Sequence, residues 1–274
     1  MPSREDVLAA FDDLVERWRG LIDRYPGEWN KKSGSAVDYV GSYLIALDGR
    51  RVPIDLERFR RGDGHAGDCS TTRMQAAADL AGTFLLGQEL IRKPGGVGPA
   101  DLLAIRRAMT TSLTPSEAIG WRQNHTYEHH ALGCWPPEKI PAIVDGICEV
   151  LNDMPTPWQP FNLYMQLGHA APFEQENARF TVLMLALCLD RIGLWPVILT
   201  GNDVRRLDWL QGSTVQSRDQ VPYMIGILQA IDQGLTLQAQ RYPTHEGFPD
   251  WSSWQPSIEY DGDQLPPPID QVGR

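Results

Sequence analysis

The run "NARFTVLMLALCLDRIG", residues 177–193, constrains the fold of this chain more than any other segment. It is apolar on nearly every side of a helical wheel, and it is too short to cross a bilayer. A helix of this kind must be covered by other elements before it is stable in water. The run therefore predicts a central buried helix around which the rest of the chain packs.

Most of the remaining chain shows the three-four spacing of amphipathic helices. In residues 4–25 the apolar side chains recur at that spacing, Ser3 is placed to cap the helix, and Pro26 and Gly27 stop it. Further helices are predicted over residues 36–47, 71–91, 100–113, 137–153, 159–169 and 221–240. The sequence shows neither an internal repeat nor a strand-helix-strand alternation. The expected fold class is an all-α bundle.

Two predicted loops, residues 49–69 and the "KPGGVGP" stretch at 93–99, interrupt the helices without dividing them into separate cores. We expect a helical extension over residues 1–69, a helical core over residues 70–240 and a Pro/Trp-rich tail over residues 241–274. The three parts are expected to form one compact unit.

Composition limits the classes of partner. The formal charge of −10 disfavours a nucleic-acid or anionic-membrane surface, which needs a basic field. The four cysteines are scattered without a CxxC spacing, and the charged start "MPSREDVLAAF" lacks the apolar core of a signal peptide. We therefore expect a cytoplasmic protein with free thiols and no membrane contact, for which a homo-oligomer is an open alternative.

The stretch before the buried helix, "GHAAPFEQE" at residues 168–176, is the best candidate for a working site. The first turn of a helix has unpaired backbone N–H groups and the positive end of the helix dipole, so it attracts anions. Asn177 and Arg179 lie in that turn, and a guanidinium matches phosphate oxygens. The structural alternative is an ordinary cap, with Asn177 capping the helix and Glu174 and Glu176 favourable beside its dipole.

The same stretch resembles the signature HPFxDGNGRxxR of the Fic family. Pro172, Phe173, Asn177 and Arg179 match it. The flanking order agrees, because "CWPPEKIPAIVDGICEVLND" resembles the turn and helix before the motif and "GLWPVILTGND" resembles its exit. "GWRQNHTYEHHALG" resembles the segment with the target-docking flap. The resemblance covers roughly residues 70–235 and implies a Fic-like helical bundle with a small flap or hairpin.

Fic enzymes typically transfer AMP from ATP to a hydroxyl side chain. The resemblance implies that residues of the loop and first turn contact the phosphates of a donor and that Pro172 and Phe173 shape the loop. The implied contact residues are Glu174, Gln175, Glu176, Asn177, Ala178 and Arg179. Catalysis of this kind consists of positioning and charge stabilisation.

Several signature positions depart from the family. Ala171 stands where the family has its catalytic His, and Gln175 replaces the carboxylate that holds Mg²⁺. Glu176 and Ala178 replace glycines, and Val182 replaces the second Arg. Three explanations for Ala171 stay open: an engineered replacement of a His, a natural loss of catalysis, or a cradle used for another phosphate-containing compound. Gln175 and Val182 indicate an altered Mg-ATP geometry in each case.

Histidines outside the signature supply further candidates. His169 is the second choice as general base, and its structural alternative is a helix-end histidine bonded to a carbonyl. The flap resemblance implies that His125, Tyr127, His129 and His130 contact the target, by strand addition along a hairpin edge. Histidines 125 and 129 with Glu128 have a metal-like spacing but no fourth ligand, so no metal site is predicted.

The function expected from the sequence is transfer of a nucleotidyl or related phosphate-containing group onto a hydroxyl acceptor. The donor would be ATP or another nucleotide or diphosphate, with the need for Mg²⁺ left open. The acceptor would be a protein or a small molecule. The alternatives are a Fic-fold enzyme of a small-molecule biosynthetic pathway and a non-catalytic Fic-fold binding protein.

Overall fold

The computed structural model describes residues 3–22, 71–109, 120–197, 199 and 201–239. The helices there are α1 (Arg4–Ile22), α4 (Thr71–Arg92), α5 (Pro99–Ala108), α6 (Tyr127–Ala131), η2 (Pro137–Lys139), α7 (Ile140–Asn152), α8 (Gln159–Ala170), α9 (Asn177–Arg191), α10 (Gly201–Ser217) and α11 (Val221–Ala239). These segments contain no strand, which confirms the all-α prediction for them. The predicted helix at 36–47, the loop at 49–69 and the tail from 241 lie outside the described residues.

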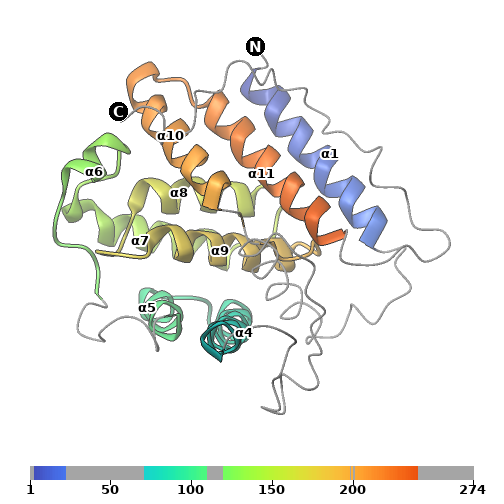
Figure 1. Cartoon of the computed structure of the whole chain (residues 1–274), viewed down its shortest axis with the longest axis horizontal. Coiled ribbons are helices and arrows are strands. Elements are labelled where there is room, and N and C mark those ends of the chain that lie inside the picture. Colours follow the sequence, from blue (N-terminus) through green and yellow to red (C-terminus); the bar gives the residue numbers. More distant parts are fainter. Residues whose placement is uncertain (1–2, 23–70, 110–119, 198, 200, 240–274) are drawn as a thin grey trace.

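The helices are arranged in three tiers (Figure 1). Helices α7, α8 and α9 form the middle tier, in which α8 and α9 pack closely along each other. Helices α4 and α5 lie on one side of that tier, and α1, α10 and α11 lie on the other. The middle tier therefore places α9 between the two outer tiers.

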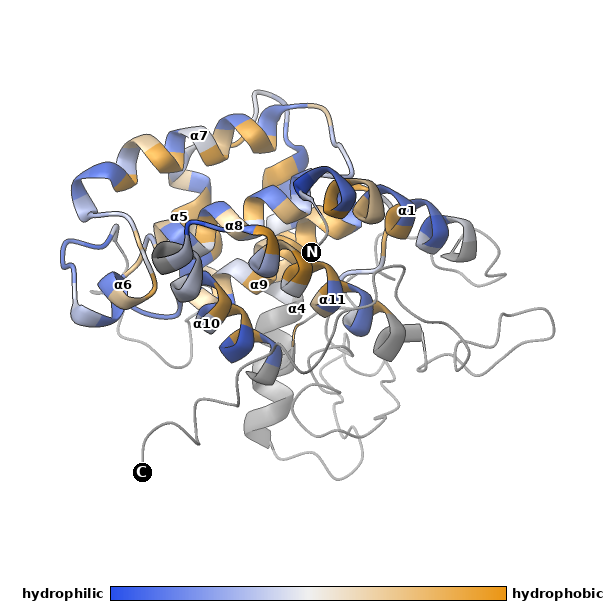
Figure 2. Ribbon diagram, turned by 90° about the horizontal axis from the view of Figure 1, so that it is seen from above, coloured by the Kyte–Doolittle hydropathy of each residue, from blue (hydrophilic) through white to orange (hydrophobic). Residues whose placement is uncertain are grey.

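Helix α9 is the central buried helix that its sequence predicts. Every residue from Phe180 to Leu189 is buried. Val182, Leu185 and Leu189 pack into a cluster with α1, α10 and α11, while Phe180 and Leu183 pack into a second cluster with α4, α5 and α7. Figure 2 shows orange, apolar residues gathered on α9 and on the sides of its neighbours. Each fully buried Leu stabilises the fold by about 1.5–3 kcal/mol before conformational entropy is counted.

Helix α1 begins and ends close to its predicted limits. The Asp6 amide donates to the Ser3 hydroxyl at 3.2 Å and the Ser3 amide donates to the Asp6 carboxylate at 2.7 Å, which is a capping box. Farther along, the Trp18 Nε1–H donates to Asp232 of α11 at 2.9 Å. The first helix thus shares a core with the last one.

Helix α10 is an element that the sequence analysis missed. Its sequence, "GNDVRRLDWLQGSTVQS", is mostly polar and contains two glycines, so its apolar positions are few. Leu207 and Leu210 are nevertheless buried against α11, where Gly226 leaves room for them. This helix carries two side chains, Asp208 and Gln211, that prove central to the candidate site.

The predicted break between α4 and α5 is confirmed. Gly95 and Gly96 have φ of 90° and 81°, a left-handed conformation that favours glycine. A Cβ at Gly96 would lie 2.6 Å from the Asn152 Oδ1, which accepts a hydrogen bond from the Val97 amide. The loop is therefore fixed to the end of α7.

Cys134, Cys148 and Cys188 are free and buried, in agreement with the prediction for these three, while Cys69 lies outside the described part. Among the described helices none is both long and apolar enough to span a bilayer.

Candidate functional site

The loop between α8 and α9 is bounded by two residues in the left-handed region. Ala171 ends α8 with φ of 37°, and Glu176 precedes α9 with φ of 63°. Such a conformation costs a non-glycine residue about 1–3 kcal/mol and persists only where the surroundings hold it. The two residues reverse the chain so that α9 begins beside the end of α8.

Asn177 fixes this loop from the first turn of α9. Its Oδ1 accepts from the Phe173 amide at 2.9 Å, and its Nδ2 donates to the Phe173 carbonyl at 2.8 Å. Asn177 is therefore a brace within the loop, and no side chain caps the amino end of α9. The first amides of α9 remain available, as an anion site requires.

Phe173 anchors the loop to the second hydrophobic cluster, in agreement with its expected role in loop shape. Its ring is 1% exposed, stacks on Trp121 at 5.4 Å and meets the edge of Phe180 at 4.9 Å. The Arg106 guanidinium lies 5.4 Å from the ring centre and donates to the Gln175 carbonyl at 3.1 Å. The backbone of the loop is thus held from α5.

A buried arginine holds the other side of the loop. Arg122 is 0% exposed, and its guanidinium donates to the carbonyls of Ala170, Ala171, Asn124 and Trp135 at 2.6–3.2 Å. Its own amide donates to the Pro172 carbonyl at 2.7 Å. A cation at the end of α8 also complements the negative end of that helix dipole. Nothing in the sequence pattern around Arg122 marks it, because a single Arg in an irregular segment has no periodicity.

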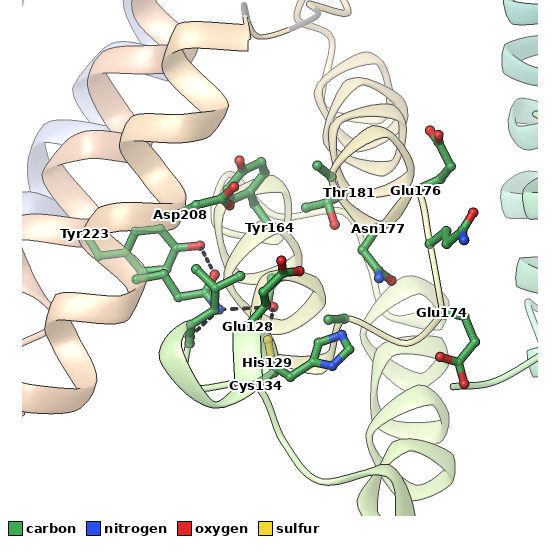
Figure 3. A pocket seen from close by; sticks show the side chains of 16 residues that line it. Glu128, His129, Cys134, Tyr164, Glu174, Glu176, Asn177, Thr181, Asp208 and Tyr223 are labelled. Atoms are coloured by element: carbon green, nitrogen blue, oxygen red, sulfur yellow. Dashed lines mark hydrogen bonds between the residues drawn. The ribbon is translucent and has the colours of Figure 1, made fainter. Parts of the chain in front are cut away.

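A cavity of about 250 Å³ opens beside the amino end of α9 (Figure 3). Its wall is built from α6, α8, α9, α10, α11 and the signature loop. Four lining residues are acidic, namely Glu128, Glu174, Glu176 and Asp208, and none of the described lining residues is a Lys or Arg. The cavity is therefore electronegative apart from the open amides of α9.

Arg179 is placed outside this cavity. Its guanidinium lies 3.5 Å from the Glu176 carboxylate, with both side chains more than a third exposed. Asn177, Ala178 and Thr181 of the same helix do line the cavity. At 3.6 residues per turn, Arg179 is on the opposite side of α9 from these three. The structure thus brings the first amides of α9 and the loop of residues 171–176 together at the cavity, whereas the Arg179 guanidinium lies outside it.

The acidic residues of the loop differ in their engagement. Glu174 accepts hydrogen bonds from the Gln123 amide at 2.7 Å and from the amide and side chain of Asn124. The Gln123 bond is the main reason that the pKa of Glu174 lies below its usual value. Gln175 is exposed and neutral. Since Glu174 is occupied and Glu176 faces Arg179, these residues do not provide the free carboxylate that a family-type Mg²⁺ site requires.

The two positions considered for a general base are Ala171 and His169. The Ala171 methyl group lines the cavity, so no side chain at that position accepts a proton. His169 lies outside the lining, with its ring edge-on to Tyr223 at 6.0 Å. Burial lowers the pKa of His169, and a hydrogen bond with the Gly133 backbone partly offsets this. That environment resembles the structural alternative given for His169.

The segment with the implied flap contains one short helix, α6, between irregular residues. Residues 120–136 contain α6 and no strand, so the hairpin expectation is wrong for these residues, since Thr126 caps a helix instead. Tyr127 is 86% exposed, and His125 stacks on His130 at 4.0 Å. The described residues hold no cluster of three His, Cys, Asp or Glu suited to a metal ion.

Of the flap histidines, His129 reaches the cavity. Its Nδ1 accepts from the Thr126 amide at 3.0 Å, and an amide can only donate. Nδ1 is therefore the unprotonated nitrogen, and the neutral ring carries its proton on Nε2. Burial is the main cause that lowers the pKa of His129, which favours this neutral form. His129 thus adds a hydrogen-bond donor to the site.

The wall opposite the loop is ordered by Gln211. Its Nε2 donates to the carbonyls of Leu132 at 2.8 Å and Gly168 at 3.1 Å, which leaves Oε1 as an acceptor. The Tyr223 hydroxyl lies 3.2 Å from that Oε1 and therefore donates to it. A Cβ at Gly168 would lie 2.7 Å from Oε1 and 3.0 Å from the hydroxyl, so only glycine leaves room for this pair.

Asp208 is the acidic residue of this wall that sequence reasoning missed. In the described part of the chain, neither a hydrogen bond nor an ion pair reaches its carboxylate. Burial raises the pKa of Asp208 to about 6. Its negative charge in turn contributes to raising the pKa of Tyr164 and of Cys134, the latter to about 11. A signal in the sequence would have required first recognising α10.

Comparisons with known proteins bear on the fold. No protein-family model matches this sequence. A search of curated proteins found no match either. Among solved structures, Fic-1 from C. elegans is similar with a TM-score of 0.54 and 16% identity, over 85% of this chain and 72% of that one. A Fic family protein from Desulfovibrio desulfuricans G20 is similar with a TM-score of 0.53 and 12% identity, over 89% and 77%.

Both similar structures are Fic proteins, and both matches span most of each chain. At these identities the likeness establishes the architecture, which agrees with the arrangement of α8, the signature loop and α9 described above. This chain has the Fic fold.

Proposed function

We propose that this protein is a divergent Fic-type transferase that acts on a phosphate-containing small molecule. The observation that carries the proposal is the uncapped amino end of α9, which opens on a cavity and is fixed by the Asn177–Phe173 pair. Backbone amides held in advance stabilise a phosphate without reorganisation. The His129 Nε2–H supplies a further donor in the same lining.

A small-molecule acceptor is favoured over a protein. Helix α6 occupies the middle of the segment where the family resemblance implied a docking edge, and the described part of that segment has no strand to which a polypeptide could add. At about 250 Å³ the cavity lies just below the range of about 300–1,000 Å³ for ordinary small-molecule sites, so it suits a small ligand. Nucleotidyl transfer to a protein would need a docking surface supplied by other parts of the chain.

The proposed transfer forms a bond from the acceptor oxygen to phosphorus while the bond to the leaving phosphate breaks. The proton of the acceptor hydroxyl goes to water, because Ala171 offers no acceptor. The loop of residues 171–176 orients the phosphate, and the α9 amides offset its charge as the bond breaks. No step depends on a metal ion.

The first prediction concerns anion binding. Asn177→Asp keeps the acceptor to the Phe173 amide but loses the donor and adds a negative charge at the amino end of α9. We expect it to weaken binding of inorganic phosphate and pyrophosphate by about tenfold, which corresponds to about 1.4 kcal/mol. Isothermal titration calorimetry measures the effect.

Asn162→Asp is the matched control for Asn177→Asp. Asn162 is exposed on α8, and among the described residues its side chain bonds only to Gln166, so the variant has the same net charge without touching the loop. It should bind phosphate as the parent does. Equal phosphate affinity of the parent and Asn177→Asp would contradict a cradle at α9.

A second candidate function, a non-catalytic Fic-fold binding protein, is favoured by the methyl group of Ala171. Ala171→His separates the two. A base at this position contributes about 10²–10⁴-fold to proton transfer, so a slow transferase should accelerate by that order with nucleoside triphosphates and hydroxyl acceptors. Mass spectrometry of the products measures the transfer. Phosphate binding without product in either form would support the binding protein.

A further inference from the structure

We propose that the wall of the cavity formed by Asp208, Tyr223, Tyr164 and Thr181 is a binding subsite for a primary ammonium group. The ligand of this protein would then carry a protonated amine opposite its phosphate. The inference deepens the proposed function and rests on it for the identity of the cavity as the ligand site. Its own evidence is separate from that of the phosphate cradle.

The first argument is the direction of the hydrogen bonds in the wall. Two carbonyls accept hydrogen bonds from the Gln211 Nε2 and so fix the orientation of its amide. The Tyr223 hydroxyl therefore donates its hydrogen bond to Oε1. The Tyr223 oxygen can then only accept a further hydrogen bond. The carboxylate of Asp208 is also an acceptor. This wall therefore calls for a ligand group that donates several hydrogen bonds.

The second argument is the presence of buried polar groups without partners. Tyr164 is 4% exposed and lines the cavity, yet within the described residues its hydroxyl takes part in no hydrogen bond. Thr181 is also 4% exposed, lines the same space from α9, and likewise has no described partner. Buried polar groups in folded proteins are paired with protein, water or ligand. Their convergence on Asp208 indicates a bound group.

The third argument is charge. The described lining has four acidic side chains and no Lys or Arg to balance them. Glu174 is bonded to backbone amides and Glu176 faces Arg179, whereas Asp208 has no such partner. Charged hydrogen bonds are about twice as strong as neutral ones. A primary ammonium, with three N–H donors and a positive charge, matches this set better than a neutral hydroxyl.

Figure 3 shows the labelled side chains of this subsite around one space, with Tyr164 on α8. Asp208 projects from α10, Tyr223 from α11 and Thr181 from α9. The amides of α9 and His129 provide donors elsewhere in the same lining. The cavity is therefore polarised, with donors for a phosphate in one part and acceptors for an amine in another.

The test uses n-propylammonium as the probe, with 1-propanol as its neutral counterpart and tetramethylammonium as a cation without N–H donors. Binding to the full chain is followed by NMR chemical-shift titration. We expect n-propylammonium to bind at least about tenfold more tightly than either comparison compound. Equal binding of 1-propanol, or of tetramethylammonium, would overturn the proposal.

Asp208→Asn is the central variant, and Tyr223→Phe is a second one that keeps the ring. We expect Asp208→Asn to weaken n-propylammonium binding at least about tenfold and Tyr223→Phe about threefold. Asp145→Asn, which removes an exposed carboxylate of α7, is the charge-matched control and should bind as the parent does. Unchanged amine binding in Asp208→Asn would refute the subsite.

The phosphate and amine results can fail separately. Asp208→Asn should still bind inorganic phosphate, while Asn177→Asp should lose phosphate and still bind n-propylammonium. If the parent protein binds n-propylammonium but not phosphate, the proposed function is wrong and the amine subsite stands. The reverse result would leave the cradle and remove the subsite.

Discussion

Arg122→Met is expected to lower the free energy of unfolding by about 3–5 kcal/mol, the range for removing one partner from a buried charged network. The guanidinium is fully buried and donates to four carbonyls, from the end of α8 to the turn before η2. Met fills similar space but satisfies none of these acceptors, each of which then loses a buried hydrogen bond. Urea denaturation followed by tryptophan fluorescence measures the change.

Arg122→Lys refines this result, and Arg4→Met is its control. A lysine keeps the charge but lacks the planar fork that reaches several carbonyls, so we expect an intermediate loss of stability. Arg4 is exposed on α1, and its replacement should change stability by no more than about 0.5 kcal/mol. A loss below about 1 kcal/mol in Arg122→Met would show that the guanidinium does not hold the loop.

Asp208→Asn is expected to raise the free energy of unfolding by about 3 kcal/mol at pH 8, although it removes a charged group from the proposed site. Burial raises the pKa of Asp208 to about 6 from its usual value of 3.8. Because the folded state holds the proton more tightly, stability from this group falls as pH rises from 3.8 to 6 and stays low above 6. Asn imitates the protonated carboxyl and avoids that loss.

The sign of this effect can be checked by its pH dependence. At pH 4 the parent is itself protonated at Asp208, so the parent and Asp208→Asn should have nearly equal stability. The groups around the carboxylate, Tyr164, Tyr223 and Cys134, all have raised pKa values and stay neutral at pH 8. Asp145→Asn controls for net charge. A variant less stable than the parent at pH 8 would mean that Asp208 has a stabilising partner.

A residue that costs stability while facing a cavity is typical of functional sites, where binding is retained at the expense of the free protein. The expected gain in Asp208→Asn and its expected loss of amine binding therefore belong together. Higher stability alone, or weaker amine binding alone, could have another cause. Both results together would connect the unpaired Asp208 carboxylate to a ligand.

The helices were predictable where their apolar periodicity is strong. Helix α9 follows from its sequence alone, because Thr181 is the single polar residue between Phe180 and Leu189. Helix α1 follows from its spacing and its Ser3 cap. Helix α10 did not follow, because Asn, Arg, Gln, Ser and Gly occupy most of its positions and two buried leucines carry its packing.

The site was predictable only in part, for geometric reasons. The loop and Asn177 could be found because neighbouring positions in sequence stay neighbours in a turn. Arg179 was expected beside them, but two residues along a helix lie on nearly opposite sides. The opposite wall of the cavity comes from residues about 30 to 50 positions later in the sequence, namely Asp208, Gln211 and Tyr223. No local sequence pattern predicts that such distant residues lie beside the loop.

The position of α9 in both hydrophobic clusters has a consequence for ligand effects. The two hydrophobic clusters pack on different sides of α9. Neither cluster can therefore unfold without exposing the helix on which the other one packs. A ligand bound at the amino end of α9 thus adds its binding free energy to the stability of both clusters. Occupancy of the cavity should therefore stabilise the surroundings of both Trp18 and Ile147, which belong to the two different hydrophobic clusters.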